Sequence, residues 1–357
     1  MSAVIRIAVV YGGRSTEHSI SCISAGSIMA HLDPEVYEVF PVGIRRDGTW
    51  VRGEIDPVGG EALPEVRGGA EIALSINPSR RGEFTDVATG ETVAQVDVVF
   101  PVLHGQFGED GTIQGMFELS GIPYVGPGVL ASASGMDKEY TKKLVALAGI
   151  TVTPEVILRG GELLLDEDKQ RLGLPVFVKP ANGGSSIGVS KVTTWEDFDA
   201  ALHQAYECDS KVIVESEQVG DEVEVGVLEF PDGRIEASVP AKLNGTDASA
   251  EGFYGFETKY MEEGVTATIP APYDASLIAT LQDQAVRAFN ALNCKGLARV
   301  DFFVTDKGPV LNEINTMPGF TAISMYPQVW NASGIDYPKL LDTLVRTALQ
   351  VADGATD

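Results

Sequence analysis

Cysteine is scarce in this sequence: only Cys22, Cys208 and Cys294 occur among 357 residues, and they lie far apart. No C-x-x-C pair is present, so the sequence favours neither a disulfide framework nor a zinc site. Cys22 and Cys294 lie in apolar segments, which predicts that they are small core residues. Long apolar runs are also missing, because none reaches the roughly 18 residues of a membrane-spanning helix. The opening run MSAVIRIAVVYGG is too short for a secretory leader, and we expect a reduced, cytoplasmic protein.

Basic residues are few as well. Lys and Arg total 26 against 51 Asp and Glu, which gives a formal net charge of −25. Such a charge repels phosphate backbones and anionic lipid, so we expect neither a nucleic acid nor a membrane surface as a partner. An anionic ligand would have to be met by a local cluster of Lys and Arg. The positions of these residues are therefore informative.

The common signatures of nucleotide sites and nucleophiles are missing too. The stretch VKPANGGSSIGVSKV (178–192) has its lysine before the glycines, unlike G-x-x-x-x-G-K-[ST]. The stretch VVYGGRSTE (9–17) does not fit G-x-G-x-x-G, and no G-x-S-x-G is present. Taken alone, the glycine stretch fits a hairpin turn as well as it fits a phosphate-binding loop.

The first part of the chain has the pattern of an open parallel sheet. The length predicts two or three domains. Apolar runs predict strands, and amphipathic runs predict helices, in this order: strand 4–10, helix 15–32, strand 36–43, strand 96–102 and helix 112–119. Ligands of such sheets bind at the carboxyl ends of the strands, where the loops with Glu17 and His104 would lie. Residues 51–92 are rich in Gly, Pro and charge and are interpreted as a surface insertion without chemistry, irregular or forming a hairpin.

The rest of the chain has an antiparallel α+β pattern. The expected elements are strands 174–179, 187–192, 211–215, 297–304 and 309–314, two strands around the turn at 231–233, and helices 137–148, 195–206, 274–292 and 337–351. The polar and aromatic segment 244–268 is too long for an ordinary connection, which is typical of a lid or of disorder.

Four polar residues form the densest constellation. Arg299 and Asp301 alternate on one predicted strand, and Glu313 and Asn315 alternate on the next, so each pair shares a face. If the strands pair through the turn at 306–308, two carboxylates, an amide and a guanidinium meet. Hard oxygen ligands suit Mg²⁺, and the arginine would stabilise a transferred phosphoryl group. A solvated polar face is the alternative, and the apolar residues between them argue against it.

Lysines next to turns are a second constellation. Lys179 ends a strand before the glycine stretch, Lys138 opens a helix and Lys259 lies in the long polar segment. A single lysine is usually a surface residue, but three near a metal patch in an acidic chain make a candidate polyphosphate clamp. His104 is interpreted as a positioning residue, and His18 as structural.

Together these stretches resemble the D-alanine–D-alanine ligases of the ATP-grasp superfamily. The resemblance runs in order through most of the chain: YGGRSTEHSIS (11–21), HGQFGEDGTIQGMFELSGIPYVG (104–126), SGMDK (134–138), VKPANGGSSIGVSKV (178–192), FYGFETKY (253–260), ARVDFF (298–303) and NEINTMPGFTAIS (312–324). It implies an N-terminal open parallel α/β domain (1–130), a central antiparallel α+β domain (131–222) and a C-terminal α+β domain (223–357). It also implies a homodimer.

The resemblance implies roles for individual residues. For ATP it implies contacts to phosphates by Lys138, Lys179 and Lys259, and to adenine and ribose by Glu215 and Glu222. It further implies a glycine loop over the γ-phosphate with Ser185 and Ser186, and a nucleotide contact by Asn312. Two Mg²⁺ ions, with Mn²⁺ as an alternative, would be held by Asp301, Glu313 and Asn315.

For the amino-acid substrates, the resemblance implies that Glu17 holds the first ammonium, with His104 nearby, and that Ser185 links Glu17 to Tyr260. Arg299 and the Gly319 N–H would stabilise the transferred phosphoryl group and the tetrahedral intermediate. Ser324 would bind the second carboxylate. From residues alone, Gly319 fits a plain type II turn equally well.

The implied reaction joins two D-alanines at the expense of ATP, through an acyl phosphate, for peptidoglycan precursors. A D-alanine–D-lactate depsipeptide ligase is the near alternative, although Tyr260 resembles the dipeptide-forming members. A nucleotide-binding regulatory protein with a degenerate site is the alternative from another class. A dehydrogenase is more distant.

Overall fold

The computed structural model describes residues 4–53, 63–184, 186–245, 266–321 and 323–354. Its first sheet has the strand order β3-β2-β1-β7, in which β1 is parallel to β2 and β7. The strands are β1 (Ile5–Gly12), β2 (Tyr37–Ile44), β3 (Trp50–Arg52) and β7 (Val98–Val102). The helices α1 (His18–His31) and α2 (Thr112–Ser120) follow β1 and β7. The predicted open parallel sheet is confirmed, with β3 added antiparallel at its edge.

The segment 51–92 is more regular than the sequence indicated. Its described part, together with Trp50 and residues 93–95, adds β3 to the first sheet and forms a small antiparallel sheet. The strands of this small sheet are β4 (Ile72–Leu74), β5 (Glu83–Asp86) and β6 (Thr92–Gln95). Ile72, Leu74 and Phe84 are buried against the first sheet, and this burial stabilises strands that weak periodicity did not reveal.

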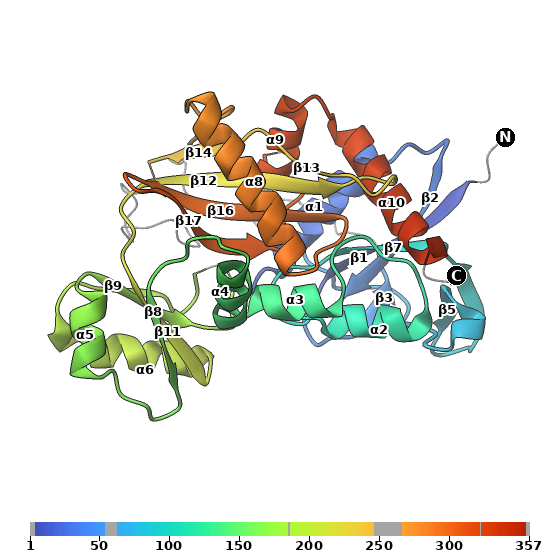
Figure 1. Ribbon diagram of the computed structural model, residues 1–357. Helices are drawn as coiled ribbons and strands as arrows, with labels where there is room; N and C mark the ends of the chain where they lie inside the picture. Colours follow the sequence, from blue (N-terminus) through green and yellow to red (C-terminus); the bar gives the residue numbers. More distant parts are fainter. Residues whose placement is uncertain (1–3, 54–62, 185, 246–265, 322, 355–357) are drawn as a thin grey trace.

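A second, wholly antiparallel sheet has the strand order β10-β9-β11-β8 and lies at the lower left of Figure 1. Its strands are β8 (Glu155–Arg159), β9 (Val176–Pro180), β10 (Ser190–Val192) and β11 (Lys211–Ser216), covered by α5 (Asp166–Leu172) and α6 (Phe198–Cys208). It has its own apolar core, which includes Val178, Phe198 and Val214. The predicted hairpin around the glycine stretch is confirmed, because β9 and β10 pair across it.

The third sheet has the order β15-β14-β12-β16-β17, with β13 paired to β12. Its strands are β12 (Asp221–Glu229), β13 (Ile235–Ala237), β14 (Ala241–Asn244), β15 (Thr266–Thr268), β16 (Leu297–Thr305) and β17 (Gly308–Asn315). The helix α8 (Ala275–Ala291) crosses this sheet in Figure 1, and Asp274 caps it by accepting a hydrogen bond from the Leu277 N–H. The long polar segment that we expected as a lid falls mostly at 246–265, outside the described residues.

Two further helices tie the third sheet to the first. These are α9 (Met325–Ala332) and α10 (Tyr337–Gly354). One core combines Tyr11 and Phe100 of the first sheet with Phe320, Tyr326 and Trp330. Cys22 is buried in this core, and Cys294 is buried between α8 and the third sheet, as predicted.

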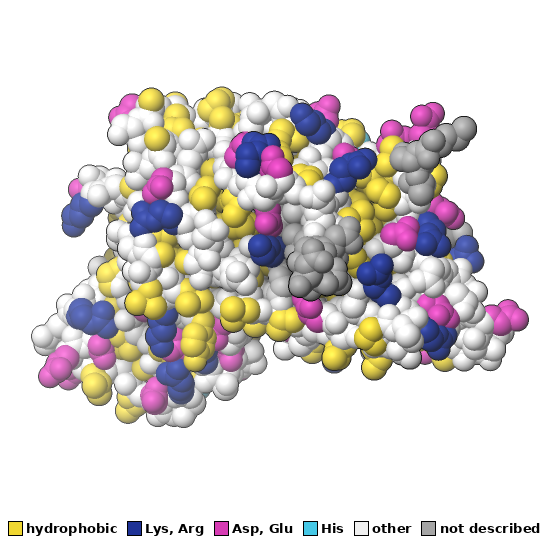
Figure 2. Space-filling model, turned by 45° about the vertical axis from the view of Figure 1, so that its right-hand side comes forward, with side chains coloured by type: hydrophobic (Ala, Val, Ile, Leu, Met, Phe, Trp, Pro, Cys, Tyr) yellow, Lys and Arg dark blue, Asp and Glu magenta, His cyan; other side chains and the backbone are white. Residues whose placement is uncertain are grey.

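The helices α3 (Val129–Met136) and α4 (Lys138–Leu147) connect the first and second sheets along the chain. Ala131, Val145 and Ile150 share a core with α8 and the third sheet rather than with the second. The expected domain boundary near residue 130 therefore stays a prediction. On the described part of the face in Figure 2, Lys and Arg side chains are dispersed among acidic ones and form no continuous basic area.

Gly12 ends β1 and sets the direction of the loop that carries Glu17. Its φ is +92°, and a Cβ there would lie 2.3 Å from the Ile44 carbonyl oxygen. We expect Gly12→Ala to lower the free energy of unfolding by about 2–4 kcal/mol, because it adds backbone strain and a steric clash. Gly68→Ala is the matched control, because a Cβ at Gly68 meets no atom within 4 Å. Urea titration checks both variants, and equal midpoints would contradict the expectation.

Candidate active site

A cavity of about 1200 Å³ opens where the three larger sheets meet. Its wall is built by the loop after β1, the loop after β7, the glycine stretch, the ends of β11 and β12, and β16 and β17 with the segment that follows. Drug-sized ligands usually occupy cavities of about 300–1,000 Å³. This cavity is therefore large enough for a nucleotide together with small substrates.

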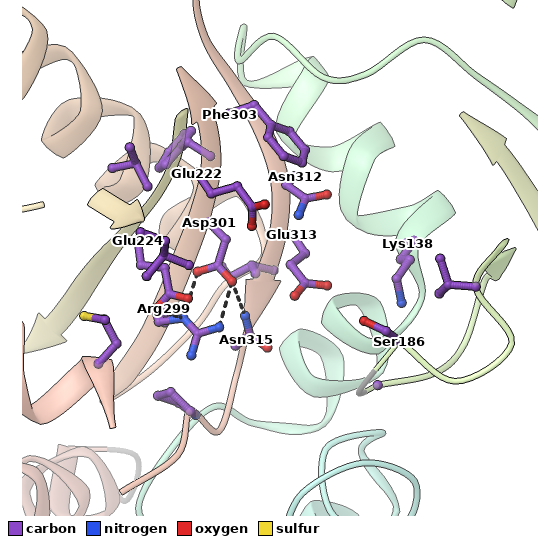
Figure 3. A pocket seen from close by; sticks show the side chains of 18 of the residues that line it. Lys138, Ser186, Glu222, Glu224, Arg299, Asp301, Phe303, Asn312, Glu313 and Asn315 are labelled. Atoms are coloured by element: carbon purple, nitrogen blue, oxygen red, sulfur yellow. Dashed lines mark hydrogen bonds and ion pairs between the residues drawn. The ribbon is translucent and has the colours of Figure 1, made fainter. Parts of the chain in front are cut away.

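Pairing of β16 with β17 assembles the predicted metal patch. Arg299 lies opposite Asn315, and Asp301 lies opposite Glu313. The register then shifts so that Phe302 lies opposite Leu311, which leaves Asn312 as the extra residue of a β-bulge. Strict alternation would direct Asn312 and Glu313 to opposite faces, but both line the cavity (Figure 3). The bulge therefore brings the predicted nucleotide residue to the same side as the predicted metal ligands.

Arg299 lies among three carboxylates. Its Nε and Nη2 atoms each donate to Asp301 at 2.8 Å, and Nε lies 3.0 Å from Glu224 Oε2. Asn315 Nδ2 donates to Asp301 Oδ2 at 2.9 Å. Burial alone would lower the pKa of Arg299, but Asp301, Glu224 and Glu313 outweigh it and hold that pKa above its ordinary value. The guanidinium is therefore always charged.

The donor set fits a hard divalent cation. One guanidinium against Asp301, Glu224 and Glu313 leaves excess negative charge in a largely buried place, which a cation would neutralise. No group of three or more His, Cys, Asp and Glu side chains with metal-binding geometry occurs in the part of the chain that the structure describes. An ion here would complete its shell with the Asn315 amide, water and substrate phosphate, as Mg²⁺ does.

Two lysines lie on the opposite wall of the cavity. Lys138 is the first residue of α4, as predicted, and its Nζ donates to the Gly183 carbonyl oxygen at 2.6 Å. Lys179 lies on β9, and its Nζ lies 2.6 Å from Glu215 Oε2. Figure 3 shows Lys138 and Ser186 on the side of the cavity that faces Glu313. The positively charged lysines thus lie across the cavity from the predicted metal ligands.

Glu215 is bound to lysines. Its carboxylate contacts Lys179 and the buried Lys142, and Lys142 Nζ also lies 3.2 Å from Glu155 Oε2. Burial alone would raise the pKa of Glu215, but the two lysines lower it from 4.5 to about 2. Its expected contact with adenine stays a prediction, because the observed contacts fix Lys179 instead. Glu222, expected at the ribose, lines the same wall.

The N-terminal wall carries Glu17 at the start of α1. Its Oε2 atom lies so close to two glycines that a Cβ at Gly105 or Gly184 would be 3.2 or 3.3 Å from it. Glu17 is buried and therefore lies between the loop after β7 and the glycine stretch. His18 is structural, as predicted, because Nδ1 contacts the Gly13 carbonyl oxygen and Nε2 accepts from the Val66 N–H.

His104 lies deep in this wall. Its Nδ1 is 3.1 Å from the Met317 carbonyl oxygen, which can only accept, so Nδ1 carries the proton. Burial lowers the pKa of His104 although Glu17 raises it, and the neutral ring presents Nε2 as an acceptor. Nε2 is buried and has no hydrogen-bond partner among the described residues. A hydrogen-bond donor of a bound ligand could therefore pair with this nitrogen atom.

Gly319 and Ser324 lie side by side at the end of the cavity. A Cβ at Gly319 would lie 2.9 Å from Ser324 Oγ, and Ser324 Oγ accepts from the Thr321 N–H at 3.0 Å. Ser324 precedes the first turn of α9, whose N–H groups favour anions. The predicted site residues from Glu17 to Ser324 all line this cavity, except Ser185, Lys259 and Tyr260, which lie outside the described residues.

Three residues of this site were missed by the sequence analysis. Glu109 lies inside the stretch HGQFGEDGT, and Glu224 shares a strand face with Glu222; both line the cavity. Lys142 follows Lys138 by one helical turn and lies behind the wall, bound to Glu215. Helical spacing from Lys138 could have indicated Lys142, and the alternation of side chains along a strand could have indicated Glu224 from Glu222. No local signal distinguishes Glu109 from its neighbour Asp110.

Glu215 gives a pH-dependent stability. Replacement by Gln removes the carboxylate that Lys179 contacts and leaves the buried Lys142 with Glu155 alone, which costs about 3–5 kcal/mol at pH 7. Because the folded pKa lies below the ordinary 4.5, the wild type has this stability above pH 4.5 and loses it as the pH falls towards 2. The difference between the wild type and Glu215→Gln in urea denaturation should shrink over that range.

Glu217→Gln is the matched control for this measurement. Its partly exposed pair with Lys191, 2.6 Å apart, is worth only about 0–1 kcal/mol. A cost for Glu215→Gln as small as that of the control, or a difference that is independent of pH, would contradict the buried network.

Comparisons with known proteins agree with this geometry. Residues 6–127 match the family described as D-ala D-ala ligase N-terminus, and residues 144–346 match D-ala D-ala ligase C-terminus. A D-alanine–D-alanine ligase of Corynebacterium diphtheriae is 64% identical over 351 residues, covering 97% of this chain and 95% of that protein.

Two solved structures have the same fold. The VanG D-Ala:D-Ser ligase from Enterococcus faecalis is 35% identical, with a TM-score of 0.83 over 97% of this chain and 100% of that one. A D-alanine–D-alanine ligase from Bacillus anthracis, complexed with ATP, is 28% identical, with a TM-score of 0.75 over 99% and 100%. Among the described residues, no helix has both the length and the apolar character needed to cross a membrane. The sheets, the cavity and these likenesses agree, and the chain belongs to the D-alanine–D-alanine ligase family, with an ATP-grasp fold.

Proposed function

We propose that this protein joins two D-alanine molecules into D-alanyl-D-alanine, with ATP converted to ADP and phosphate, for peptidoglycan precursor synthesis. The observation that carries this proposal is the cavity in which Arg299, Asp301, Glu313 and Asn315 face Lys138 and Lys179, with Glu17 on the third wall. The 64% identity to a D-alanine–D-alanine ligase supports the same activity.

ATP binds along the wall formed by the second sheet and β12. Lys138 and Lys179 contact its phosphates, and Glu215 with Lys142 keeps Lys179 in place. Ser186 at the glycine stretch and Asn312 at the bulge line the same space, and Glu222 is the candidate partner of the ribose. Ser185 and Lys259 keep the phosphate roles that the resemblance implies.

Asp301, Glu313 and Asn315 would hold two Mg²⁺ ions, or Mn²⁺. Such ions neutralise charge on the phosphates that are transferred. Glu224 lies 3.0 Å from Arg299, so Arg299 would still have a carboxylate partner if Asp301 bound a cation. Arg299 then remains directed at the cavity, where it stabilises the charge of the transferred phosphoryl group.

The first D-alanine places its ammonium between Glu17 and His104. Glu17 supplies the negative charge, and Nε2 of His104 supplies the acceptor that has no partner among the described residues. A carboxylate is a poor acyl donor, so its oxygen attacks the γ-phosphorus of ATP, the bond to ADP breaks, and an acyl phosphate forms. Ser185 and Tyr260 keep their implied roles near Glu17.

The second D-alanine directs its carboxylate to Ser324 and the start of α9. Its neutral amine attacks the acyl carbon, and the Gly319 N–H together with Arg299 stabilises the oxyanion. Phosphate leaves with the bonding electrons, and the amine loses its proton. Water must be excluded, because it would hydrolyse the acyl phosphate.

The proposal also includes the oligomeric state, the cellular location and the domain boundaries that we expect from the sequence. The protein acts as a homodimer in the cytoplasm, and its three domains divide near residues 130 and 222. The second substrate needs its own test, because one relative of the same fold is named a D-Ala:D-Ser ligase.

Purified protein should release phosphate from ATP only when D-alanine is present. Mass spectrometry should find D-alanyl-D-alanine, with L-alanine inactive and with D-lactate or D-serine as poorer second substrates. Chelation of divalent cations should abolish turnover and Mg²⁺ should restore it. Absence of D-alanine-dependent phosphate release would overturn the proposal, and preference for D-lactate or D-serine across pH would reassign the second substrate.

A further inference from the structure

The loop after β7 holds the backbone of Met317 from both sides. Glu109 Oε1 accepts a hydrogen bond from the Met317 N–H at 3.1 Å, and His104 Nδ1 donates to the Met317 carbonyl oxygen at 3.1 Å. The other carboxylate oxygen of Glu109 accepts from the Gly105 N–H at 2.7 Å. The two contacts to Met317 join residues that are 208 and 213 positions apart in the chain.

Glu109 is an unusual residue to find here. It lines the substrate cavity, yet both its oxygens bind backbone N–H groups, and no Lys, Arg or His forms an ion pair with it in the described part of the chain. Burial, followed by the charge of Glu17, raises the pKa of Glu109 to about 8, against the effect of the two N–H donors. The protein thus keeps a buried acidic side chain, at a cost in free energy, whose hydrogen bonds go to the backbone N–H groups of Gly105 and Met317.

The stretch it holds leads directly to Gly319. Pro318 fixes its own φ, so the direction of the chain at Gly319 follows from the position of Met317. At the other end, the Phe320 N–H donates to Ser24 Oγ at 3.4 Å, and the Phe320 ring packs on Phe100 with centroids 6.0 Å apart. Gly319 therefore lies between two anchored residues.

Room at Gly319 is also limited, because a Cβ there would collide with Ser324 Oγ. A small displacement of Met317 would thus move the Gly319 N–H relative to Ser324, and with it both candidate contacts to the second substrate. An oxyanion donor works only when it is preorganised for the charge that develops.

We propose that Glu109 is a positioning residue that fixes the Met317–Gly319 backbone, and so places the Gly319 N–H for acyl transfer. This rests on the proposed ligase function. Glu109 acts through Met317 and contacts no substrate. His104 contributes the second half of the same clamp, while its Nε2 faces the first substrate.

The test compares Glu109→Ala and Glu109→Gln with the wild type. Loss of one oxyanion-hole donor costs about 10²–10³ in kcat, so a donor that is only loosened should cost about 10–100-fold in Glu109→Ala. Gln keeps the length and one acceptor but turns an NH₂ group towards a backbone N–H. We expect Glu109→Gln to lose about 3–10-fold, since a hydrogen bond is worth roughly 0.5–1.5 kcal/mol.

Two further readouts separate positioning from other roles. The KM for ATP should stay within about twofold of the wild type while kcat falls. Hydrogen exchange of the peptide that contains Met317 and Gly319 should accelerate in both variants, also without substrates. Glu118→Gln is the matched control, because Glu118 is exposed on α2 and keeps an acceptor for the Tyr124 hydroxyl.

Unchanged kcat in Glu109→Ala would overturn the inference. So would a Glu109→Gln variant that is as inactive as Glu109→Ala but shows no faster exchange at Met317, because Glu109 would then act on the substrate directly. If Glu109→Ala does not fold, Glu109→Gln and its exchange rates still decide. If the wild type shows no D-alanine-dependent turnover, the ligase function fails, whereas unchanged exchange at Met317 would refute the clamp itself.

Discussion

The pairing of β16 with β17 is the constraint on which the site depends. It sets Asp301 opposite Glu313 and Arg299 opposite Asn315, and the bulge at Asn312 turns one more polar side chain to the same side. The apolar residues Val300 and Ile314 between them are buried in the core under α8, so the two strands cannot slide without exposing that core. The register that buries the core is therefore the register that assembles the metal patch.

Charge balance inside the cavity follows from this arrangement. Arg299 is held by Asp301 and Glu224, and Lys179 is held by Glu215, so each cation has a fixed direction before any ligand arrives. The formal net charge of −25 makes the surroundings unfavourable to phosphates. Binding of a polyphosphate is therefore a local property of lysines at the ends of strands and helices, together with cations at the acidic patch. This explains why a strongly acidic protein can bind an anionic nucleotide.

Much of the fold and part of the site follow from the sequence. Continuous apolar runs predicted β1, β2 and β7 because these strands are buried in a parallel sheet, and period-two alternation predicted that Arg299 and Asp301 share a face. The lysine before the glycines in VKPANGGSSIGVSKV is also explained, because Lys179 is the last residue but one of β9 and the glycines lie in the connection to β10. Local sequence patterns were therefore sufficient to predict a strand, or the face on which its side chains lie, wherever a single strand or helix determines that feature.

The features of the site that the sequence did not predict depend on contacts between distant parts of the chain. The bulge at Asn312 shifts the register by one residue, which alternation alone does not reveal. Glu215 fits a nucleotide contact by resemblance, but the buried Lys142 binds it, and only packing of α4 brings this lysine near. Glu109 gains its role from Met317, far along the chain. Tertiary contacts decide the chemistry of these side chains, and no short window of sequence contains them.

The central claim is that the cavity activates a carboxylate by phosphorylation and then transfers the acyl group to an amine. D-Alanine labelled with ¹⁸O in its carboxylate tests this most directly, with the released phosphate analysed by mass spectrometry or ³¹P NMR. Transfer through an acyl phosphate predicts one ¹⁸O atom in each phosphate released and the other in the new peptide carbonyl. Phosphate free of the label, with dipeptide still formed, would contradict the account.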